Sequence, residues 1–344
     1  MEFFYPIFCG YIYTINNLTT MDTTNQAIPY HQRAGYACIN MSLSSQGIMT
    51  NRDAIQRTFQ TKGLAHISKL ALANVIDLEK IVHWNEQNGI KFYRISSRLF
   101  PWMTEYEFED LPDWEEIKVV LRRIGKAATR AGRTGQRLEF HPSHFTILAS
   151  PNPTTVARSI RDLEQHSKIF DTMGLEPSHW NCLNIHVGGA YGNKESAASK
   201  WCENFLKLSE NCRKRVVVEN DDKANMYSVK DLYHMVYEKV GAPITFDIFH
   251  HTFCTGGLSA HEAANLAAST WKDAPMVIHW SSSMRSYENP EAKTVAHADY
   301  IYDKFEDWGT GGWFMCESKA KELSLLEYFE KGPRPQLIVE KTQS

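Results

Sequence analysis

The sequence predicts an α/β fold, a (β/α)8 TIM barrel in which eight parallel strands form a barrel inside a ring of helices. Short runs rich in β-branched and aromatic residues alternate with longer helical stretches eight times along the chain. The runs are mostly apolar on both faces, as strands of a buried parallel sheet are. No Gly/Ser-rich linker or block of like charge divides the 344 residues, so we expect one barrel domain over residues 31–335.

Eight short segments carry the strand pattern. They are residues 34–40, 92–96, 137–141, 182–187, 215–219, 244–247, 276–280 and 312–317. The stretches between them carry the helical pattern, and several begin at a Ser, Asn or Asp cap and end at glycine. Residues 51–87 are long enough for more than one helix. Further helices are expected over residues 112–132, 153–174, 193–212, 228–240, 259–271, 294–308 and 318–330.

The two ends of the chain lie outside the expected barrel. Residues 1–30 form an N-terminal appendage, either disordered or the product of an upstream start, since Met21 is an alternative first residue. The first 15 residues contain no Lys or Arg and so lack the basic front of a signal peptide. Residues 336–344 form a C-terminal tail. No apolar run is long enough for a membrane-spanning helix, so no membrane partner is expected.

Charge and cysteine content exclude several classes of protein. The 37 Lys and Arg against 40 Asp and Glu give a formal charge of -3, so the overall charge does not attract nucleic acid. Binding to DNA therefore needs a local basic face, or metal ions held by carboxylates. The seven cysteines are odd in number and form no C-x-x-C pair. This argues against a disulfide framework or a zinc knot and favours a reducing compartment, either the cytoplasm or the nucleus or nucleoid.

Six successive strands end in an imidazole or a carboxylate. In chain order these residues are His141, His186, Glu219, Asp247 followed by His250, His279 and Glu317. The carboxyl ends of parallel barrel strands open at one mouth, where the catalytic groups of this fold lie. A single histidine on an apolar strand is usually a core residue, but side chains this costly to bury, repeated at one rim, predict a metal site. With His297 there are more donors than one ion needs, so we expect several divalent ions and phosphodiester hydrolysis by activated water.

Loop residues near the mouth are weaker candidates for DNA contacts. The glycine-rich segment 188–194 could hold a phosphate on its amides and Lys194, or be a plain turn. Phe145, next to His144, could wedge into a base stack or pack as core. The other candidates are Tyr36 and Asn40 near the end of the first strand and Arg285 in a polar loop after the seventh.

Nine segments together resemble the UV damage endonuclease family, which is related in fold to endonuclease IV. They are GYACIN (35–40), FYRISSRLFPW (92–102), LEFHPSHF (138–145), NIHVGGAYGNKE (184–195), VVVEND (216–221), FDIFHH (246–251), IHWSS (278–282), HADYI (297–301) and MCESKAKE (315–322). They extend in order over nearly the whole chain after residue 30. The resemblance implies a TIM barrel that nicks duplex DNA immediately 5′ to UV photoproducts and leaves a 3′-hydroxyl, with abasic sites and other lesions as further candidate substrates.

The resemblance also implies cofactors, partners and individual roles. We expect up to three divalent metal ions, manganese first with zinc or magnesium as alternatives, no nucleotide cofactor, and a monomer acting on damaged double-stranded DNA. The implied ligands are Glu219 bridging two ions, His141 and His186 completing one site, Asp247, His279 and Glu317 the second, and His250, His297 and, more weakly, Asp299 the third. The implied catalytic residues are Glu219, Glu317 and Lys194. The implied DNA contacts are Tyr36 at the lesion and Lys194 and Lys319 at phosphates, and the candidates Asn40, His144, Phe145 and Arg285 are expected beside them along the mouth.

The sequence departs from the family in three places. The family loop His-Pro-Gly-Gln-Tyr after the first metal-binding histidine reads here Ser143, His144 and Phe145 after the proline, so the phenol that probes the lesion is missing. The family lysine two residues before the strand-seven histidine is Val277, which is expected to weaken or rearrange the metal cluster. Arg98 replaces an acidic residue and adds positive charge near the rim.

Two alternative functions stay open at this point. A metal-dependent sugar isomerase or epimerase uses the same barrel and a similar rim, but it needs neither rim aromatics nor phosphate-binding loops. The departures at His144, Phe145 and Val277 suggest the second alternative, a non-catalytic lesion-binding protein, which would bind damaged duplex without cutting the strand. A nicking assay beside a ketose–aldose assay and a gel shift separates the three possibilities.

Overall fold

The computed structural model describes residues 29–129 and 135–335. Nearly all of the expected appendage, the expected tail at 336–344 and the expected end of a helix at residue 132 lie outside these ranges. Within them, no helix combines the length and the apolar character that crossing a bilayer requires.

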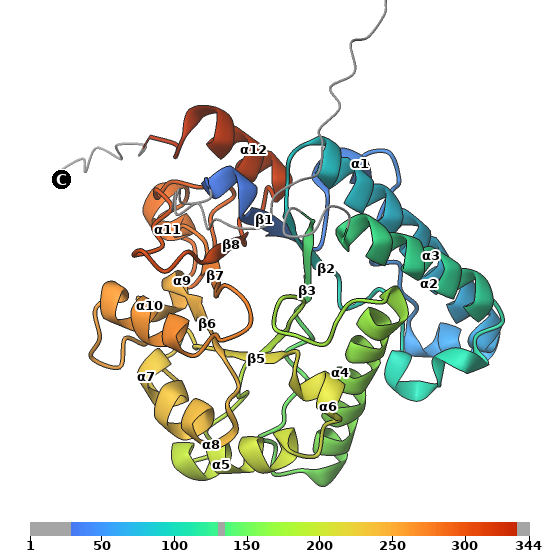
Figure 1. Ribbon diagram of the computed structural model, residues 1–344, viewed down its shortest axis with the longest axis horizontal. Coiled ribbons are helices and arrows are strands. Elements are labelled where there is room, and N and C mark those ends of the chain that lie inside the picture. The colour runs from blue at the N-terminus through green and yellow to red at the C-terminus, as the bar shows by residue number, and fades with distance from the viewer. Residues whose placement is uncertain (1–28, 130–134, 336–344) are drawn as a thin grey trace, which may run out of the picture.

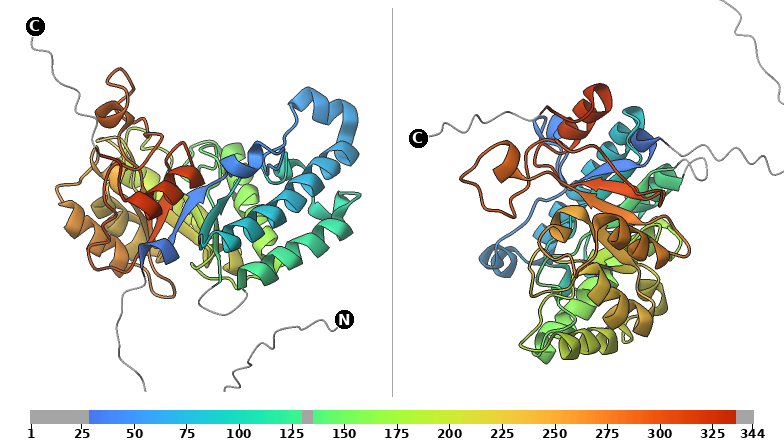
Figure 2. Two further views of the ribbon diagram at one scale, coloured as in Figure 1. Left: turned by 90° about the horizontal axis from the view of Figure 1, so that it is seen from above. Right: turned by 90° about the vertical axis from the view of Figure 1, so that its left-hand side faces the viewer.

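Eight parallel strands close into a barrel at the centre of the molecule (Figure 1). Each strand pairs with the next along the chain, and the last pairs with the first. The strands are β1 (Ala34–Ala37), β2 (Phe92–Ile95), β3 (Arg137–Phe140), β4 (Leu183–Ile185), β5 (Val216–Glu219), β6 (Ile244–Asp247), β7 (Val277–Trp280) and β8 (Trp313–Cys316). Every strand lies in its expected segment, and views from two further directions show helices around the strands (Figure 2). The predicted TIM barrel is confirmed.

The helices lie outside the barrel and mostly start at the predicted caps. They are α1 (Met41–Ser44), α2 (Gln56–Gln87), α3 (Trp114–Thr129), α4 (Pro153–Met173), α5 (Lys194–Phe205), α6 (Glu210–Arg213), α7 (Val229–Leu232), α8 (Glu238–Val240), α9 (Ile248–His251), α10 (Ala260–Ser269), α11 (Met284–Tyr287) and α12 (Glu322–Lys331). The cap side chains of Asn152, Asn193, Ser228 and Ser259 each accept a hydrogen bond from a backbone N–H in the first helical turn. Gly174 then ends α4 in the left-handed conformation, with φ of 76°.

Three expected helical segments are interrupted in the structure. The chain bends within α2 at Gly63, whose φ of 64° and ψ of -167° are not helical, so this segment holds two helices as expected. A short loop separates α5 from α6 within the expected helix 193–212. A π-helical turn, Tyr233–Tyr237, joins α7 to α8.

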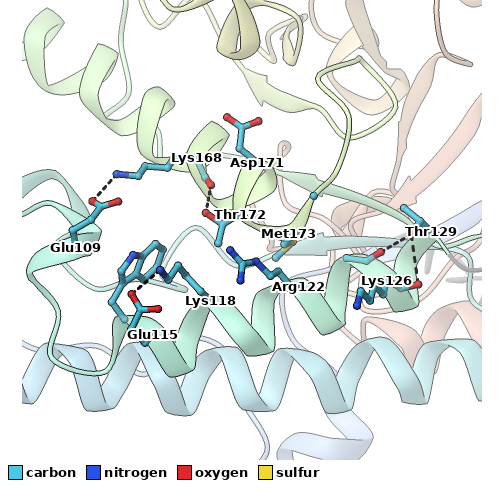
Figure 3. Close-up of a pocket in the computed structure, with 13 residues that line it drawn as sticks. Glu109, Glu115, Lys118, Arg122, Lys126, Thr129, Lys168, Asp171, Thr172 and Met173 are labelled. Atoms are coloured by element: carbon cyan, nitrogen blue, oxygen red, sulfur yellow. Dashed lines mark hydrogen bonds and ion pairs between the residues drawn. The ribbon is translucent and has the colours of Figure 1, made fainter.

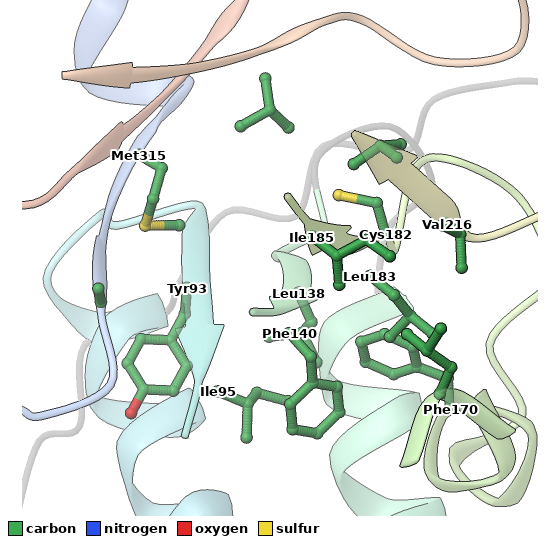
Figure 4. Packing of buried hydrophobic residues seen from close by; sticks show 14 of the residues in the cluster. Tyr93, Ile95, Leu138, Phe140, Phe170, Cys182, Leu183, Ile185, Val216 and Met315 are labelled. Atoms are coloured by element: carbon green, nitrogen blue, oxygen red, sulfur yellow. The ribbon is translucent and has the colours of Figure 1, made fainter. Parts of the chain in front are cut away.

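The strands are buried on both faces, which explains their nearly continuous apolar runs. On β3, Phe140 faces outward, and its ring centroid lies 5.0 Å from that of Phe170 on α4 (Figure 4). The preceding residue on the same strand, Glu139, faces the barrel interior instead, where its carboxylate accepts a hydrogen bond from Arg94 of β2. The alternation along β3 therefore places polar groups inside the barrel and apolar groups under the helices.

The expected helix over residues 294–308 is wrong, because the backbone N–H groups of this segment bond to the loop after β7 rather than to a preceding helical turn. The N–H of Ala298 donates to the carbonyl of Ser282 at 2.8 Å. The N–H of Tyr302 donates to the hydroxyl of the same serine at 3.0 Å. An isolated antiparallel bridge joins His297 to Ser283. These contacts hold the irregular segment against the loop after β7 and so place His297 near the strand ends.

A buried arginine closes the bottom of the barrel, at the amino ends of the strands. Arg137 has no exposed surface. It donates hydrogen bonds of 2.7 to 3.0 Å to the backbone carbonyls of His179, Trp180 and Pro275. Its guanidinium carbon lies 5.1 to 5.9 Å from the ring centroids of Phe92, Trp180, Trp271 and Trp313. These contacts fill the lower barrel, so polar chemistry has to be sought at the opposite end.

A cavity of about 720 Å³ lies on the outer wall between α3 and α4 (Figure 3). Two of its lysines are paired with acids: Lys118 with Glu115 at 2.6 Å and Lys168 with Glu109 at 2.7 Å. The cavity contains none of the residues that the sequence marks as functional.

Candidate metal centre

The mouth of the barrel brings together the imidazoles and carboxylates that the sequence places at strand ends. Three overlapping groups have potential ligand atoms within 4.8 Å of one another. The groups are His141, His186 and Glu219; Glu219, Asp247 and His250; and Asp247, His279 and Glu317. Glu219 belongs to two groups and Asp247 to two, so the three groups form one continuous cluster.

Glu219, the last residue of β5, stands at the centre of this cluster and is 1% exposed. Its Oε2 lies 3.1 Å from Nε2 of His141 and 3.5 Å from Nε2 of His186. Its Oε1 lies 3.2 Å from Nδ1 of His250 and 3.0 Å from Nδ1 of His279. Each carboxylate oxygen therefore faces two imidazoles, and the two oxygens serve different pairs.

Asp247, the last residue of β6, is held in place through its backbone. Its N–H donates to the side-chain oxygen of Asn220 at 2.9 Å, and its carbonyl accepts from the amide of the same asparagine at 2.9 Å. Its Oδ1 accepts from the N–H of His250 at 2.7 Å and so caps α9. Its Oδ2 is buried with no hydrogen-bond partner among the described residues and lies 3.6 Å from Nδ1 of His250. A buried carboxylate oxygen without a donor calls for a cation.

Glu317 follows β8 and links the cluster to the segment after β7. Its Oε1 lies 3.5 Å from Nδ1 of His279, and its Oε2 lies 3.6 Å from Nδ1 of His297. His297 is thus beside the cluster, although it is not a member of the three groups. Asp299 is not a member either: it is exposed, and its N–H is bonded to Glu288. The predicted Asp299 ligand is therefore not brought to the centre.

Opposite charges within the cluster shift the pKa values of its carboxylates and imidazoles. Burial would raise the pKa of the Glu219 carboxyl, but the imidazoles of His279 and His186 hold it well below its usual range. Burial lowers the pKa of His186, yet the negative charges of Glu219 and Asp221 outweigh this and raise it to about 9. In the same way Asp247 and Glu219 outweigh burial and raise the pKa of His250 to about 11. Positive charge is therefore favoured at this mouth.

Two predicted DNA-contacting residues stand at the edge of the mouth. A cavity of about 520 Å³ opens over His141, His186 and His250, and His144 and Phe145 form part of its wall. Phe145 is 72% exposed, and its ring centroid lies 4.0 Å from that of His144. The alternative that Phe145 packs as core is thereby wrong.

Two basic residues predicted to meet phosphates are also exposed. Arg285 lies at the start of α11 and lines a separate cavity of about 710 Å³ together with Phe249 and Phe253. Lys319 follows Glu317 closely in the chain, and its N–H donates to the carbonyl of Ala298 at 3.1 Å.

Three other residues that were predicted to contact DNA are instead bonded to neighbouring residues of the protein. Tyr36 is fully buried and faces α2, where its hydroxyl donates to Asn85 at 2.7 Å. Asn40 is 1% exposed and caps α1 by accepting from the N–H of Leu43. The ammonium group of Lys194 pairs with Asp231 at 2.7 Å. The expectation that Tyr36 contacts DNA at the lesion is corrected, because strand alternation turns its ring toward α2.

Sequence reasoning missed four polar residues that adjoin the cluster. They are Arg94, Glu139, Asn184 and Asp221. Oδ1 of Asp221 lies 3.1 Å from Nδ1 of His186, and the amide of Asn184 donates to Oε2 of Glu219. A signal was present for two of them: Arg94 and Glu139 are charged residues within apolar strand runs, which are costly to bury unless they are paired.

The position at which the family carries a lysine lies on strand β7 of the barrel. Val277, on β7, is fully buried, and it is two residues before His279. Asp247, His279 and Glu317 still lie within ligand distance of one another despite this change.

Comparison with known proteins assigns the chain to a family. The sequence profile of a family described as UV-endonuclease UvdE matches residues 32–340. The chain belongs to this UV-endonuclease family. The UvdE match covers the whole described barrel, and membership makes the protein an endonuclease, a hydrolase of DNA repair.

Individual UvdE relatives agree with this assignment. A putative UV-damage endonuclease of Acanthamoeba polyphaga mimivirus is 31% identical over 310 residues, which are 87% of this chain and 91% of that protein. The UV-damage endonuclease of Schizosaccharomyces pombe is 32% identical over 317 residues, 89% of this chain but 51% of that protein. The chain thus spans about half the length of the S. pombe relative. The crystal structure of SacUVDE is 30% identical, with a TM-score of 0.75 over 87% of this chain and 96% of that one.

Proposed function

We propose that this protein is a divalent-metal-dependent endonuclease that nicks damaged duplex DNA immediately 5′ to UV photoproducts and leaves a 3′-hydroxyl. The observation that carries the proposal is the arrangement around Glu219, whose two oxygens face different pairs of imidazoles at the open end of an endonuclease-family barrel. Abasic sites and other distorting lesions are further candidate substrates. Family membership argues against the sugar isomerase alternative.

The residues at the mouth fit divalent metal ions. The donors are imidazole nitrogens and carboxylate oxygens, which suit manganese and zinc, with magnesium a less natural choice for the nitrogen-rich sets. Oδ2 of Asp247 and Nδ1 of His279 are buried without a hydrogen-bond partner in the described part of the chain, as ligand atoms are before they meet an ion. The ions would be held by His141, His186, Glu219, Asp247, His250, His279, His297 and Glu317.

The residues at the mouth have different proposed roles in cleavage. Divalent ions bound here would supply activation of a water molecule and neutralisation of the phosphate charge. Glu219 and Glu317 orient the centre through their carboxylates, and Glu219 joins its two halves. The amide of Asn184 donates to Oε2 of Glu219, which fixes the orientation of that carboxylate. The carboxylate of Asp221 lies 3.1 Å from Nδ1 of His186 and favours positive charge on that imidazole.

DNA is expected to lie across the mouth and to be recognised by its rim. Phe145 is exposed enough to stack on a base or enter a distorted step, with His144 beside it as a hydrogen-bond donor. Arg285 and Lys319 are exposed at the strand-seven and strand-eight side, where they can meet phosphates. Lys194 is a weaker candidate, since it is already paired with Asp231.

The decisive experiment uses a duplex oligonucleotide with one UV photoproduct and a label on the damaged strand. With Mn²⁺ present, we expect one cut directly 5′ to the lesion and a product that a polymerase can extend from its 3′-hydroxyl. EDTA and the Glu219→Gln variant should each remove the cut. A shifted but uncut duplex would support the lesion-binding alternative, and a cut elsewhere would overturn the proposed position.

A further inference from the structure

A buried arginine lies directly beneath the metal centre and contacts three strands. Arg94, on β2, is 5% exposed and points into the barrel. Its Nε donates to Oε1 of Glu139 on β3 at 2.6 Å, and its Nη1 donates to the carboxylate of Glu317 at the end of β8. Its Nη2 lies 2.6 Å from Nε2 of His279 on β7. Since a guanidinium is planar and can only donate, these three partners are fixed relative to one another.

Glu139 is the partner of Arg94 that lies deepest in the barrel. It has no exposed surface, and within the described residues its only ion pair is with Arg94. Its second oxygen lies 3.6 Å from the sulfur of Cys182, which is only a weak donor, so Arg94 is the group that balances the negative charge of Glu139. Glu139 is two residues before His141, which directly follows β3, so both side chains face inward, one layer apart.

Unless a carboxylate balances it, the positive charge of Arg94 would disfavour cation binding by the neighbouring ligands. Glu317 is one of the carboxylates proposed to hold a cation, and Arg94 competes with that cation for the carboxylate. A buried charge without a partner is strongly unfavourable, so Arg94 deprived of Glu139 would pair more closely with Glu317. Its unbalanced charge would also repel a divalent cation beside it.

We propose that Glu139 is a positioning residue, which anchors and neutralises Arg94 so that Glu317 stays oriented toward, and available to, a divalent cation. The inference rests on the metal centre of the proposed function. It adds a role for two residues that act beneath the ligands: Glu139 acts through Arg94, and Arg94 acts on Glu317.

The test measures binding of Mn²⁺ alone to the whole protein, by the electron paramagnetic resonance signal of the free ion. The Glu139→Gln variant should bind Mn²⁺ about tenfold more weakly at the sites that Glu317→Gln also weakens. Adding Arg94→Met to Glu139→Gln removes the unbalanced charge and should restore the affinity to within about threefold of wild type. A merely structural role for Glu139 predicts no such rescue, since the double variant is the more heavily altered protein.

A matched control addresses general destabilisation. Asp171→Asn removes a carboxylate that pairs with Arg215 at 2.8 Å. Arg215 is another fully buried arginine, and this ion pair lies outside the barrel interior. This variant should bind Mn²⁺ like wild type, and circular dichroism with thermal melting in EDTA should show that each variant is folded. If Glu139→Gln does not fold, Glu139→Asp, which retracts the carboxylate from Arg94 by one methylene, should show a smaller loss at the same sites.

The outcomes separate the two proposals. No Mn²⁺ binding by the wild-type protein would overturn the proposed metal centre itself. Binding by wild type with equal binding by the folded Glu139 variants would overturn only the role of Glu139. A loss that Arg94→Met does not reverse, or an equal loss in Asp171→Asn, would also overturn that role.

Discussion

Nε2 of His141 lies 3.1 Å from Oε2 of Glu219, although the two residues are separated by 78 positions in the chain. Barrel closure makes this contact, because β3 and β5 end at the same mouth. The other oxygen of Glu219 faces His250 and His279 instead. The carboxylate of Glu219 thus connects imidazoles from four different strands or the loops that follow them.

Replacing Glu219 by glutamine should reduce nicking of UV-damaged duplex by about a thousandfold or more. An amide keeps the size of the side chain but removes the negative charge that both halves of the centre share. Strand cleavage on the labelled photoproduct duplex checks this result. Glu262→Gln, an exposed change at the cap of α10, is the control and should cut normally. Near-normal cleavage by the Glu219 variant would remove this residue from the mechanism.

The metal affinity should rise with pH up to about pH 9. Glu219 and Asp221 outweigh burial and raise the pKa of His186 to about 9, so a bound ion has to displace a proton over this range. For each proton displaced, Mn²⁺ affinity should increase by about tenfold per pH unit. Calorimetry in buffers of different ionisation enthalpy measures the released protons, and no proton release at pH 7.5 would contradict the prediction.

The stability of the metal-free protein, in contrast to its metal affinity, should fall as pH rises. The pKa of His186 is raised on folding, so the stability it contributes is complete below about pH 6.5 and is lost as pH rises through about 9. Thermal melting in EDTA should therefore give a falling melting temperature over this interval. In His186→Asn the fall should be smaller, and an equally steep fall in this variant would assign the effect to other groups.

Replacing Phe145 by alanine should weaken binding to photoproduct-containing duplex by about tenfold, as loss of one stacking contact does. The side chain is 72% exposed, so the melting temperature should stay within about 1 °C of wild type. Gel shifts on damaged and undamaged duplexes measure the effect. Leu206→Ala, at another exposed apolar side chain (58% exposed), is the matched control and should bind normally. Phe145→Trp should retain binding if stacking is the reason.

Replacing Arg285 by alanine should weaken DNA binding to a similar extent for damaged and undamaged duplex. A lost phosphate contact should also lower the slope of log affinity against log salt by about one. Binding titrations at several salt concentrations provide the slope. Arg122→Ala, an exposed arginine on α3 at the outer wall, should leave the slope unchanged, and an equal change in both variants would place DNA elsewhere.

Removal of divalent ions should destabilise the fold as well as stop cleavage. A ligand at about 100 times its dissociation constant stabilises a protein by about 2.7 kcal/mol, which corresponds to about 4 °C for a chain of this size. Thermal melts with Mn²⁺ and with EDTA measure this difference. The difference should disappear in Glu219→Gln, and an equal Mn²⁺-induced shift in that variant would place the binding outside the centre.

The sequence was sufficient for the barrel and for most of the proposed ligands. Strand ends could be located from their apolar runs, and a parallel barrel brings strand ends together whatever the loops do. His141, Glu219 and Glu317 are therefore predictable as neighbours without any knowledge of side-chain geometry. Asp299 was not, because it lies in the irregular segment after β7, whose path depends on bonds to Ser282 and Glu288.

The remaining differences have physical causes that a residue pattern does not contain. Tyr36 was expected at the rim, but the side of a strand that faces the helices is settled by packing, here against Asn85. Lys194 was expected at a phosphate, but Asp231, 37 positions away, neutralises it first. Arg94 and Glu139 escaped notice because each is costly alone and acceptable only as a pair across two strands.

The arginine plug formed by Arg137 and its surrounding rings has a consequence for exchange kinetics. With the lower end filled, cations enter and depart along the route that a docked duplex occupies. Occupancy by substrate should consequently slow the escape of ions, and chelators should act fastest on the enzyme between turnovers.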